Sequence, residues 1–579
     1  MAASGVKRVG AGRGRDMRGS VRAALWLFGV LSCISCTCSR NEAPAAVPTD
    51  PPKAAALADE MPARTSRPSS ELNRTSPIGS NIQTVVDYSV DIPFVDLFKS
   101  SRPWISGAGN KWNDGRSIDL DENGWVRSLK PNQVARTLML NRGGHPGGEF
   151  IVLYDGEGQI DHDNELLQNQ SRAGRHMIHV KKNAALRFEI SKTDPRNPIR
   201  NIRVFPPGGS CEEDDARWCD RSHPCPNGSC LPFEQTYQER IFHPKFLRAM
   251  GRYAVLRFMD WMRTNDSTIR TWSDRPKVTH ATWGRRGVPI EVMVSLARRL
   301  RAEPWFNIPH LADDDYVARF ASLVHDTLPE DFRVWVEYSN EVWNSMFDQH
   351  REVARCPAGK REEGKHRAAL VCQAERTDAV FRIWRQVFGQ SASRVVRVVG
   401  TQASVPWVSE TLLTHRKLHE RVDALAIAPY FGLIAKHETE TEIARLSLDE
   451  LLERTENELL PKAIKYMQDQ AEVAQRFGLT LVAYEGGQHF AAVRGVENNE
   501  EINTLFDAIN RHPRMKDLYL RYLAAWREAG GQLFVNFINC GSYTKWGRFG
   551  LREYVDQPRE EAPKFDAVMQ FIEQNPRWW

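Results

Sequence analysis

The sequence predicts an α/β protein built on one (β/α)8 TIM barrel, with a small antiparallel β-sandwich inserted near its start. Three observations support this fold. Beyond residue 240, apolar strands alternate with amphipathic helices, whereas residues 117–205 hold short runs of period two. Seven strands of the alternating part, together with one strand near residue 81, make the eight strands of a closed barrel.

The first residues of the 579-residue chain account for its net charge and predict an export signal. The formal net charge of +5 comes entirely from residues 1–32, which contain six basic residues and one acidic residue. The rest of the chain is neutral and has no basic block, so we expect no nucleic-acid partner. Basic residues followed by the apolar run 23–32 are typical of a secretory signal peptide, which we assign to residues 1–35.

The end of this signal leaves two modes of export open. The segment Leu31-Ser-Cys-Ile-Ser-Cys36 resembles the lipobox of bacterial lipoproteins, which implies membrane attachment through a lipidated Cys36 or Cys33. Plain secretion is the alternative, because neither cysteine has the usual Leu three positions before it. We therefore expect a cell-envelope lipoprotein or an extracellular protein. Residues 36–80, rich in Pro, Ala, Ser and Thr, are predicted to be a disordered linker.

Residues 81–116 are predicted to start the barrel, with a first strand at 81–86 and a helical turn at 94–99. The inserted sandwich follows at 117–205. Its expected strands lie at 124–129, 135–140, 149–154, 176–180, 185–190 and 199–205. Acidic residues between these runs lack the spacing of a calcium loop, and we assign them to hairpin turns.

Ten cysteines in an exported chain indicate disulfides. Four of them crowd the loop 206–240: Cys211, Cys219, Cys225 and Cys230. A four-thiolate zinc site is the alternative there, although only the last pair approaches the usual spacing of zinc ligands. Spacing does not rank the three possible disulfide pairings. We expect a third bridge between Cys356 and Cys372, and a buried thiol at Cys540.

Residues 241–579 are predicted to form the main part of the catalytic barrel. Its expected strands lie at 254–259, 304–308, 333–337, 395–399, 424–428, 480–484 and 532–537, and helices between them include 289–301, 315–327, 463–477 and 515–529. A doubly wound open sheet would also alternate, but no strand ends in a Gly-rich phosphate loop. We therefore expect no cofactor.

Two carboxylates directly follow predicted strands, at the end of a barrel where catalytic groups lie. Glu341 comes after the fourth strand and Glu485 after the seventh, on opposite sides of the ring. Side chains that converge from these positions can lie about 5 Å apart, as the two carboxyl groups of a retaining glycosidase do. One carboxyl must then stay protonated near neutral pH while the other is ionised.

The same segments carry a family resemblance. Tyr338-Ser-Asn-Glu-Val-Trp-Asn344 resembles the Asn-Glu signature of the clan of retaining (β/α)8 glycoside hydrolases that includes cellulases, mannanases and β-glycosidases. Tyr484-Glu-Gly-Gly487 is similar to the segment of that clan that carries the nucleophile. The resemblance implies Glu341 as acid/base, Glu485 as nucleophile and Asn340 as ligand of the sugar 2-hydroxyl.

Further substrate-binding residues are expected at the same end of the barrel. Tyr430 ends the sixth strand, where its hydroxyl can orient Glu485, and His310 follows the third strand as a sugar ligand. Tryptophans predicted in loops at this end offer flat faces for sugar rings: Trp261, Trp283, Trp343 and Trp546. An acidic run at 313–315 opens a predicted helix and is assigned to capping, so we expect no metal site.

Together these patterns predict a secreted or lipid-anchored retaining glycoside hydrolase that cleaves a β-linked polysaccharide or oligosaccharide. Two alternatives remain open at this stage. One is a glycan-binding barrel that holds a saccharide without cleaving it. The other places carbohydrate binding in the β-sandwich, with the barrel as its scaffold.

Overall fold

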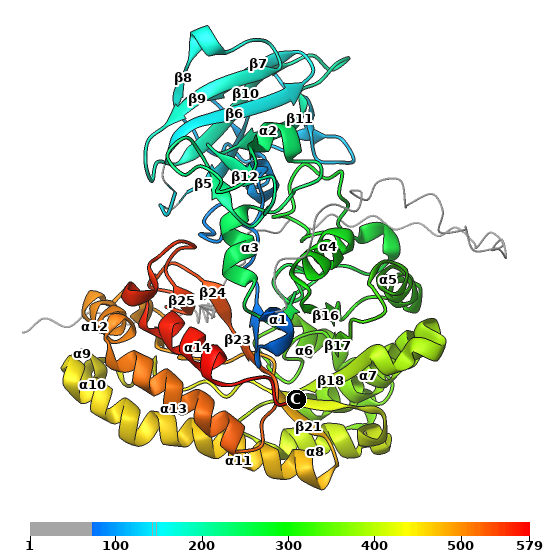
Figure 1. Ribbon diagram of the computed structural model, residues 1–579. Helices are drawn as coiled ribbons and strands as arrows, with labels where there is room; N and C mark the ends of the chain where they lie inside the picture. Colours follow the sequence, from blue (N-terminus) through cyan, green and yellow to red (C-terminus); the bar gives the residue numbers. More distant parts are fainter. Residues whose placement is uncertain (1–71, 142, 146) are drawn as a thin grey trace, which may run out of the picture.

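The computed structural model describes residues 72–141, 143–145 and 147–579, and Figure 1 shows a β-sandwich above a helix-wrapped barrel. The predicted signal peptide, lipidation site and most of the predicted linker fall in residues 1–71 and lie outside the described residues. No helix among the described residues is long and apolar enough to cross a membrane.

The barrel closes as predicted, through eight strands that all pair in parallel. They are β1 (Ile78–Asn81), β15 (Val255–Arg257), β16 (Glu303–Ile308), β17 (Val334–Tyr338), β18 (Val395–Gly400), β19 (Ala424–Ile427), β21 (Thr480–Ala483) and β23 (Phe534–Asn536). The main helices around it are α3 (Pro244–Met250), α4 (Ile290–Leu300), α5 (Asp314–Thr327), α7 (Lys365–Phe388), α8 (Pro406–Thr414), α11 (Leu460–Arg476), α13 (Arg514–Glu528) and α14 (Pro563–Gln574). The confirmed (β/α)8 architecture places the ends of all eight strands at one face.

Shorter elements complete the outer layer and the loops of the barrel. The helices are α1 (Leu72–Thr75), α2 (Phe233–Thr236), α6 (Asp348–Val353), α9 (Glu440–Ala444), α10 (Leu448–Arg454) and α12 (Glu500–Arg511). The loop strands are β20 (Ile434–Ala435), β22 (Ala491–Ala492), β24 (Ile538–Cys540) and β25 (Gly550–Arg552).

The first barrel strand begins three residues earlier than the sequence predicts. Apolar residues at 82–86 favoured a strand there, yet Ile82 and Val85 are buried in the segment after β1. The strand itself needs small residues, because a Cβ at Gly79 would lie 2.8 Å from the carbonyl oxygen of Val255. Close approach of neighbouring strands, and not side-chain hydrophobicity, decides the position of β1.

The inserted sandwich consists of two four-stranded antiparallel sheets, as the period-two runs predict. One sheet has the order β2 (Ile105–Gly107), β5 (Val134–Leu140), β10 (Leu186–Thr193), β7 (Gly158–His162), and the other has β11 (Arg200–Phe205), β6 (Gly148–Asp155), β9 (Arg175–Val180), β8 (Glu165–Leu166). A small ribbon of β3 (Asp119–Leu120) and β4 (Val126–Ser128) adjoins them. Because β2 pairs with β5, the sandwich extends before residue 117. The two sheets share one apolar core that includes Phe150, Ile178, Phe188 and Ile190.

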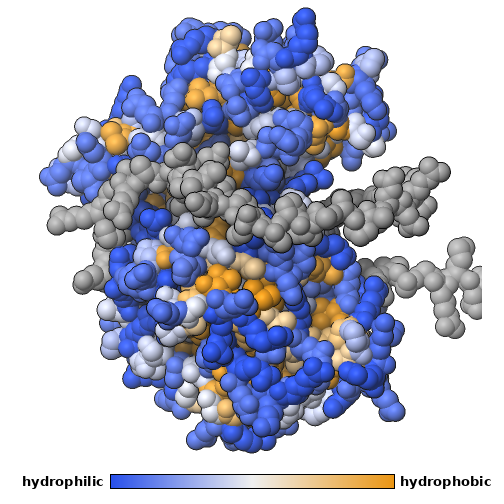
Figure 2. Space-filling view, turned by 90° about the vertical axis from the view of Figure 1, so that its right-hand side faces the viewer, coloured by the Kyte–Doolittle hydropathy of each residue, from blue (hydrophilic) through white to orange (hydrophobic). Residues whose placement is uncertain are grey.

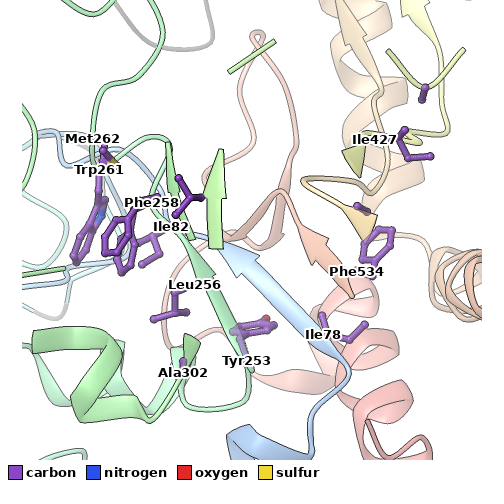
Figure 3. Close-up of a cluster of buried hydrophobic side chains, with 14 of the residues drawn as sticks. Ile78, Ile82, Tyr253, Leu256, Phe258, Trp261, Met262, Ala302, Ile427 and Phe534 are labelled. Atoms are coloured by element: carbon purple, nitrogen blue, oxygen red, sulfur yellow. The ribbon is translucent and has the colours of Figure 1, made fainter. Parts of the chain in front are cut away.

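The main hydrophobic core lies between the barrel strands and the surrounding helices. Figure 3 shows part of it, with Ile78 of β1, Leu256 of β15 and Phe534 of β23 on three successive barrel strands. The surface seen in Figure 2 is mostly hydrophilic over both parts, with hydrophobic side chains gathered near the middle of the barrel.

The described residues form three disulfides, including the predicted Cys356–Cys372 bridge. Of the three pairings left open in the cysteine-rich loop, the structure has Cys211–Cys225 and Cys219–Cys230. These bridges hold a three-stranded sheet of β12 (Gly209–Cys211), β13 (Trp218–Cys219) and β14 (Cys230–Pro232). The sulfurs are engaged with one another, which excludes the zinc alternative for this loop. Cys540 is a buried free thiol, as expected.

Candidate active site

Glu341 reaches the end of the barrel through a sharp turn after β17. Ser339 has φ of 59° and Glu341 has φ of 43°, so two non-glycine residues on either side of Asn340 adopt the left-handed conformation. This conformation costs about 1–2 kcal/mol per residue, and such strain concentrates at functional sites. The turn is held by the surrounding contacts: Tyr484 Oη donates to Glu341 Oε1 at 2.9 Å, and Asn344 Nδ2 donates to Oε2 at 2.8 Å.

Glu485 directly follows Tyr484 at the end of β21 and is only 7% exposed. The Tyr430 hydroxyl donates a hydrogen bond to it, which is the orienting role expected for Tyr430. Glu485 Oε2 is buried and has no hydrogen-bond partner among the described residues. The next residue must be small, because a Cβ at Gly486 would lie 2.5 Å from the ring of Phe534. The glycine therefore lets the chain pass closely over β23.

Arg257, at the end of β15, connects the two carboxylate segments. Its Nε and Nη2 donate to Glu337 Oε2 at 3.1 and 2.9 Å, and Nη2 also donates to Asn340 Oδ1 at 2.8 Å. Its Nη1 donates to Asn81 Oδ1 of β1 at 3.1 Å. The guanidinium also lies 5.0 Å from the ring centroid of Tyr484. One buried cation therefore joins strands β1, β15, β17 and β21 under the site.

The same cation acts on Glu485. Arg257 Nη1 lies 3.5 Å from Glu485 Oε2, close enough for strong attraction in a site shielded from water. Burial, followed by the charge of Glu341, raises the pKa of Glu485 to about 8. Burial also raises the pKa of Glu341, although the hydrogen bonds from Asn344 and Tyr484 act against it. The two carboxyls therefore titrate as a pair that keeps one proton near neutral pH.

Arg257 lowers the pKa of both carboxyls, and its Nη1 lies 3.5 Å from Glu485 Oε2. In the singly protonated pair, one carboxyl is neutral and the other is ionised. This gives one acid and one anion, the two states that acid-assisted displacement at an acetal requires.

Asn340 lies between the two strained residues and is 2% exposed. Its Oδ1 accepts from Arg257, and its Nδ2 donates to Asn265 Oδ1 at 3.0 Å. These bonds fix the orientation of the amide, and the second N–H of Nδ2 remains for a ligand.

His310 is placed differently from the sugar ligand that the sequence suggests. Its Nε2 is 2.8 Å from Glu352 Oε2, while its Nδ1 is buried without a hydrogen-bond partner among the described residues. Burial lowers the pKa of His310 despite the neighbouring carboxylate. Within the described part of the chain, the ring makes no hydrogen bond or ion pair with Glu341 or Glu485, and its partner is Glu352.

The four expected tryptophan platforms divide into two groups. Trp261 is fully buried, its Nε1 donates to the Gln83 carbonyl, and Figure 3 shows it in the core. Trp283 is 4% exposed and packs edge-on against Phe94. Neither can offer a ring face to a sugar, which corrects the expectation for both. Both side chains point into the core, and their positions in the sequence do not reveal this direction.

The other two tryptophans keep an accessible surface. Trp546 is 42% exposed, with Lys545 Nζ 4.7 Å from its ring centroid. Trp343 is half-buried against the main core, and its Nε1 is buried without a partner among the described residues. Trp343 lies two residues after Glu341, so its unpaired Nε1–H is close to Glu341 in the sequence.

Sequence reasoning did not identify Arg257 and Glu337 as an ion pair or Tyr484 as a ligand of Glu341. A signal for the pair was available, because each charged residue interrupts an otherwise apolar strand. Glu337 is 2% exposed and also accepts from Trp305 Nε1 and Asn307 Nδ2. A charge inside an apolar strand predicts a buried partner on a neighbouring strand.

Comparisons with known proteins find only distant structural similarity. No family model and no curated protein matches the chain. Fungal β-1,4-galactanases share 12% identity over 58% of this chain and 92% of theirs, with a TM-score of 0.29. An endo-β-1,4-mannanase from Thermotoga petrophila shares 13% over 57% of this chain and 73% of its own, with a TM-score of 0.32. A family 1 β-glucosidase from Thermotoga maritima shares 10% over 57% and 85%, also with a TM-score of 0.32. Similarity at this level carries no statement about activity.

Proposed function

We propose that this protein is a retaining glycoside hydrolase that acts on a β-linked polysaccharide or oligosaccharide. The observation that carries the proposal is that Glu341 and Glu485, at the ends of β17 and β21, lie close enough for the charge of Glu341 to raise the pKa of Glu485. Arg257 and Tyr430 contact Glu485, whereas Tyr484 and Asn344 hold Glu341. The substrate class rests on the resemblance of the two strand-end motifs.

The first chemical step uses both carboxyls. Glu485 attacks the anomeric carbon and forms a carbon–oxygen bond as the bond to the leaving-group oxygen breaks. Glu341 gives its proton to that oxygen, which departs as an alcohol. The free N–H of Asn340 donates to the sugar 2-hydroxyl, a contact that strengthens as positive charge develops at the ring.

The second step reverses the roles. Glu341, now ionised, removes a proton from water while the water oxygen bonds to the anomeric carbon. The bond to Glu485 breaks and its carboxylate is restored beside Arg257. Glu341 recovers its proton, so the pair returns to its starting state.

We also propose that the chain acts outside the cytoplasm, either secreted or lipid-anchored through Cys36 or Cys33. The signal-like N-terminus supports export. Three disulfides fit an oxidising compartment, because such bridges do not persist in the reducing cytosol.

A covalent trapping experiment tests the proposed function. Wild-type protein is first assayed on a panel of β-linked glycans, and then incubated with 2-deoxy-2-fluoro glycosides of the sugars released. The fluorine slows both steps, so a glycosyl-enzyme should accumulate and peptide mapping should place the sugar on Glu485.

Two matched variants complete the test. Glu485→Gln should give no adduct and no hydrolysis. Glu341→Gln should still form the adduct from an activated aryl glycoside, because such a leaving group needs no proton. Glycan binding without any turnover by the wild type would instead establish the non-catalytic barrel. An adduct on another residue would displace Glu485 from its role.

A further inference from the structure

A second cavity lies outside the proposed active site, between the cysteine-rich loop and two barrel helices. Its volume is about 920 Å³, within the range of small-molecule sites. Its walls come from the loop around Trp218, from α3, and from the segment that runs from β25 into α14. Figure 1 shows α3 beside α14, with β12 of the cysteine-rich loop above them. None of its lining residues is shared with the carboxylate site.

The cavity has an excess of positive charge. Six of its lining residues are Arg or Lys and two are acidic: Arg217, Lys245, Arg248, Arg252, Arg552 and Arg559 against Asp556 and Glu573. Both acids already contact a cation, since Lys245 pairs with Asp556 and Arg559 pairs with Glu573. No carboxylate of the cavity wall is therefore left to pair with the remaining arginines.

Two of these arginines have guanidinium groups that are free for an anion. Arg217 and Arg248 are exposed, and their side chains make no hydrogen bond or ion pair with any described residue. Arg552 differs, because it is only 7% exposed and its charge lowers the pKa of the buried Asp91. The two exposed guanidinium groups can each bind a carboxylate or sulfate through two parallel hydrogen bonds.

Aromatic rings accompany the charges. Lys245 Nζ lies 4.9 Å from the ring centroid of Trp218, and the Arg552 guanidinium lies 4.1 Å from that of Phe565. Trp218 is held in place by the Cys219–Cys230 bridge next to it. A rigid ring beside several guanidinium groups suits a ligand that has both a flat apolar face and oxyanions.

We propose that this cavity binds an acidic glycan, a saccharide that carries carboxylate or sulfate groups. Sugar rings present C–H faces to Trp218, and their oxyanions meet the exposed guanidinium groups of Arg217 and Arg248. A concave site of this depth does not fit the flat surface of a membrane, and a single small anion would leave most of the volume unfilled. The site is separate from Glu341 and Glu485, so it would hold a charged chain independently of hydrolysis.

The test measures binding by calorimetry in the full chain carrying Glu485→Gln, so that turnover does not enter. The probes are hexagalacturonate and a sulfated dextran oligosaccharide, each beside its uncharged counterpart, the methyl ester and unsulfated dextran. At least one acidic probe should bind ten-fold or more tightly than its neutral counterpart, and added salt should weaken that binding.

Matched variants locate the site. Arg217→Ala with Arg248→Ala should weaken binding of the acidic probe at least ten-fold. The control, Arg445→Ala with Arg521→Ala, removes the same charge from two exposed positions that do not line the cavity and should leave binding unchanged.

Several outcomes would overturn the proposal. These are equal affinity for charged and neutral probes, equal losses in the cavity and control variants, inorganic phosphate binding as tightly as the oligosaccharides, or binding only to vesicles containing phosphatidylglycerol. Failure here would not affect the proposed hydrolase, because the trapping experiment does not involve this cavity. Conversely, an inactive wild type would leave the binding measurement intact.

Discussion

The end of the barrel and the inserted sandwich differ in whether they bury charged residues. Among the described residues of the sandwich, 105–205, no Asp, Glu, Lys or Arg is a buried residue. The barrel buries Arg257, Glu337 and Glu485 within a few ångströms of one another. Burying charge opposes folding unless every group is paired, and Glu485 Oε2 is not hydrogen-bonded. The barrel end therefore loses stability by burying charge, whereas the sandwich does not.

Substitution of Glu485 should give the largest effect, a loss of activity together with a gain in stability. We expect Glu485→Gln to lower kcat by about 10⁴-fold or more, since the nucleophile is lost. A carboxyl whose pKa is raised in the folded state holds its proton more tightly there than in the unfolded chain. The protein therefore loses stability as pH rises from about 5 to about 8. The variant should therefore gain about 1–3 kcal/mol of unfolding free energy at pH 8, measured by urea titration.

A sandwich carboxylate provides the control for this variant. Glu189 pairs with Arg136 on the sandwich surface, and its side chain is 30% exposed. Glu189→Gln should leave activity unchanged and should not raise stability between pH 5 and 8. A gain of stability in Glu189→Gln equal to that in Glu485→Gln would remove the contrast between the two regions.

The next effect separates buried from exposed ion pairs. Arg257→Met leaves Glu337 without its cation, and we expect a loss of about 3–5 kcal/mol of unfolding free energy. Arg187→Met breaks the exposed Arg187–Asp163 pair of the sandwich and should cost at most about 0.5 kcal/mol. Urea unfolding of both variants measures the difference, and similar losses would show that burial does not distinguish the two pairs.

A smaller effect should appear in the pH profile. Activity requires the singly protonated pair, so its alkaline limb should lie near pH 8, above the range of an ordinary carboxyl. The Tyr484 hydroxyl lowers the pKa of Glu341, and Tyr484→Phe should therefore move the alkaline limb of kcat to higher pH. The maximal rate should fall about ten-fold. A shift to lower pH would mean that Tyr484 favours the protonated form instead.

The smallest effect concerns the exposed tryptophan. Trp546→Ala should change the unfolding free energy by less than about 0.5 kcal/mol, as expected for an exposed position. It should raise KM on a long glycan more than on a short one if the ring holds a distant sugar unit. Trp261→Ala is the matched core variant and should cost about 3–5 kcal/mol. Equal KM changes on short and long glycans would exclude a platform role for Trp546.

These regions also differ in how far the sequence predicts them. The two strand-end carboxylates are accessible to sequence reasoning, because a barrel fixes where its strands end, and the third disulfide follows from the few cysteines available. The first strand is misplaced because Gly79 carries no hydrophobic signal. Trp261 and Trp283 are misassigned because a loop tryptophan can turn into the core, and the direction is set by distant residues such as Phe94. The role of Arg257 depends on four strands at once, so no local pattern contains it.

The position of β1 has a consequence for the order of folding. Asn81 at its end donates to the carbonyl of Asn536, a residue 455 positions later in the chain, and also accepts from Arg257. A growing chain lacks this neighbour until residue 536 has been synthesised, whereas the sandwich strands find their partners within about one hundred residues. The sandwich strands can therefore pair early, while the residues around the two carboxylates assemble later. A chain that stops before residue 536 would hold all the sandwich strands but could not close the barrel beneath Glu341 and Glu485.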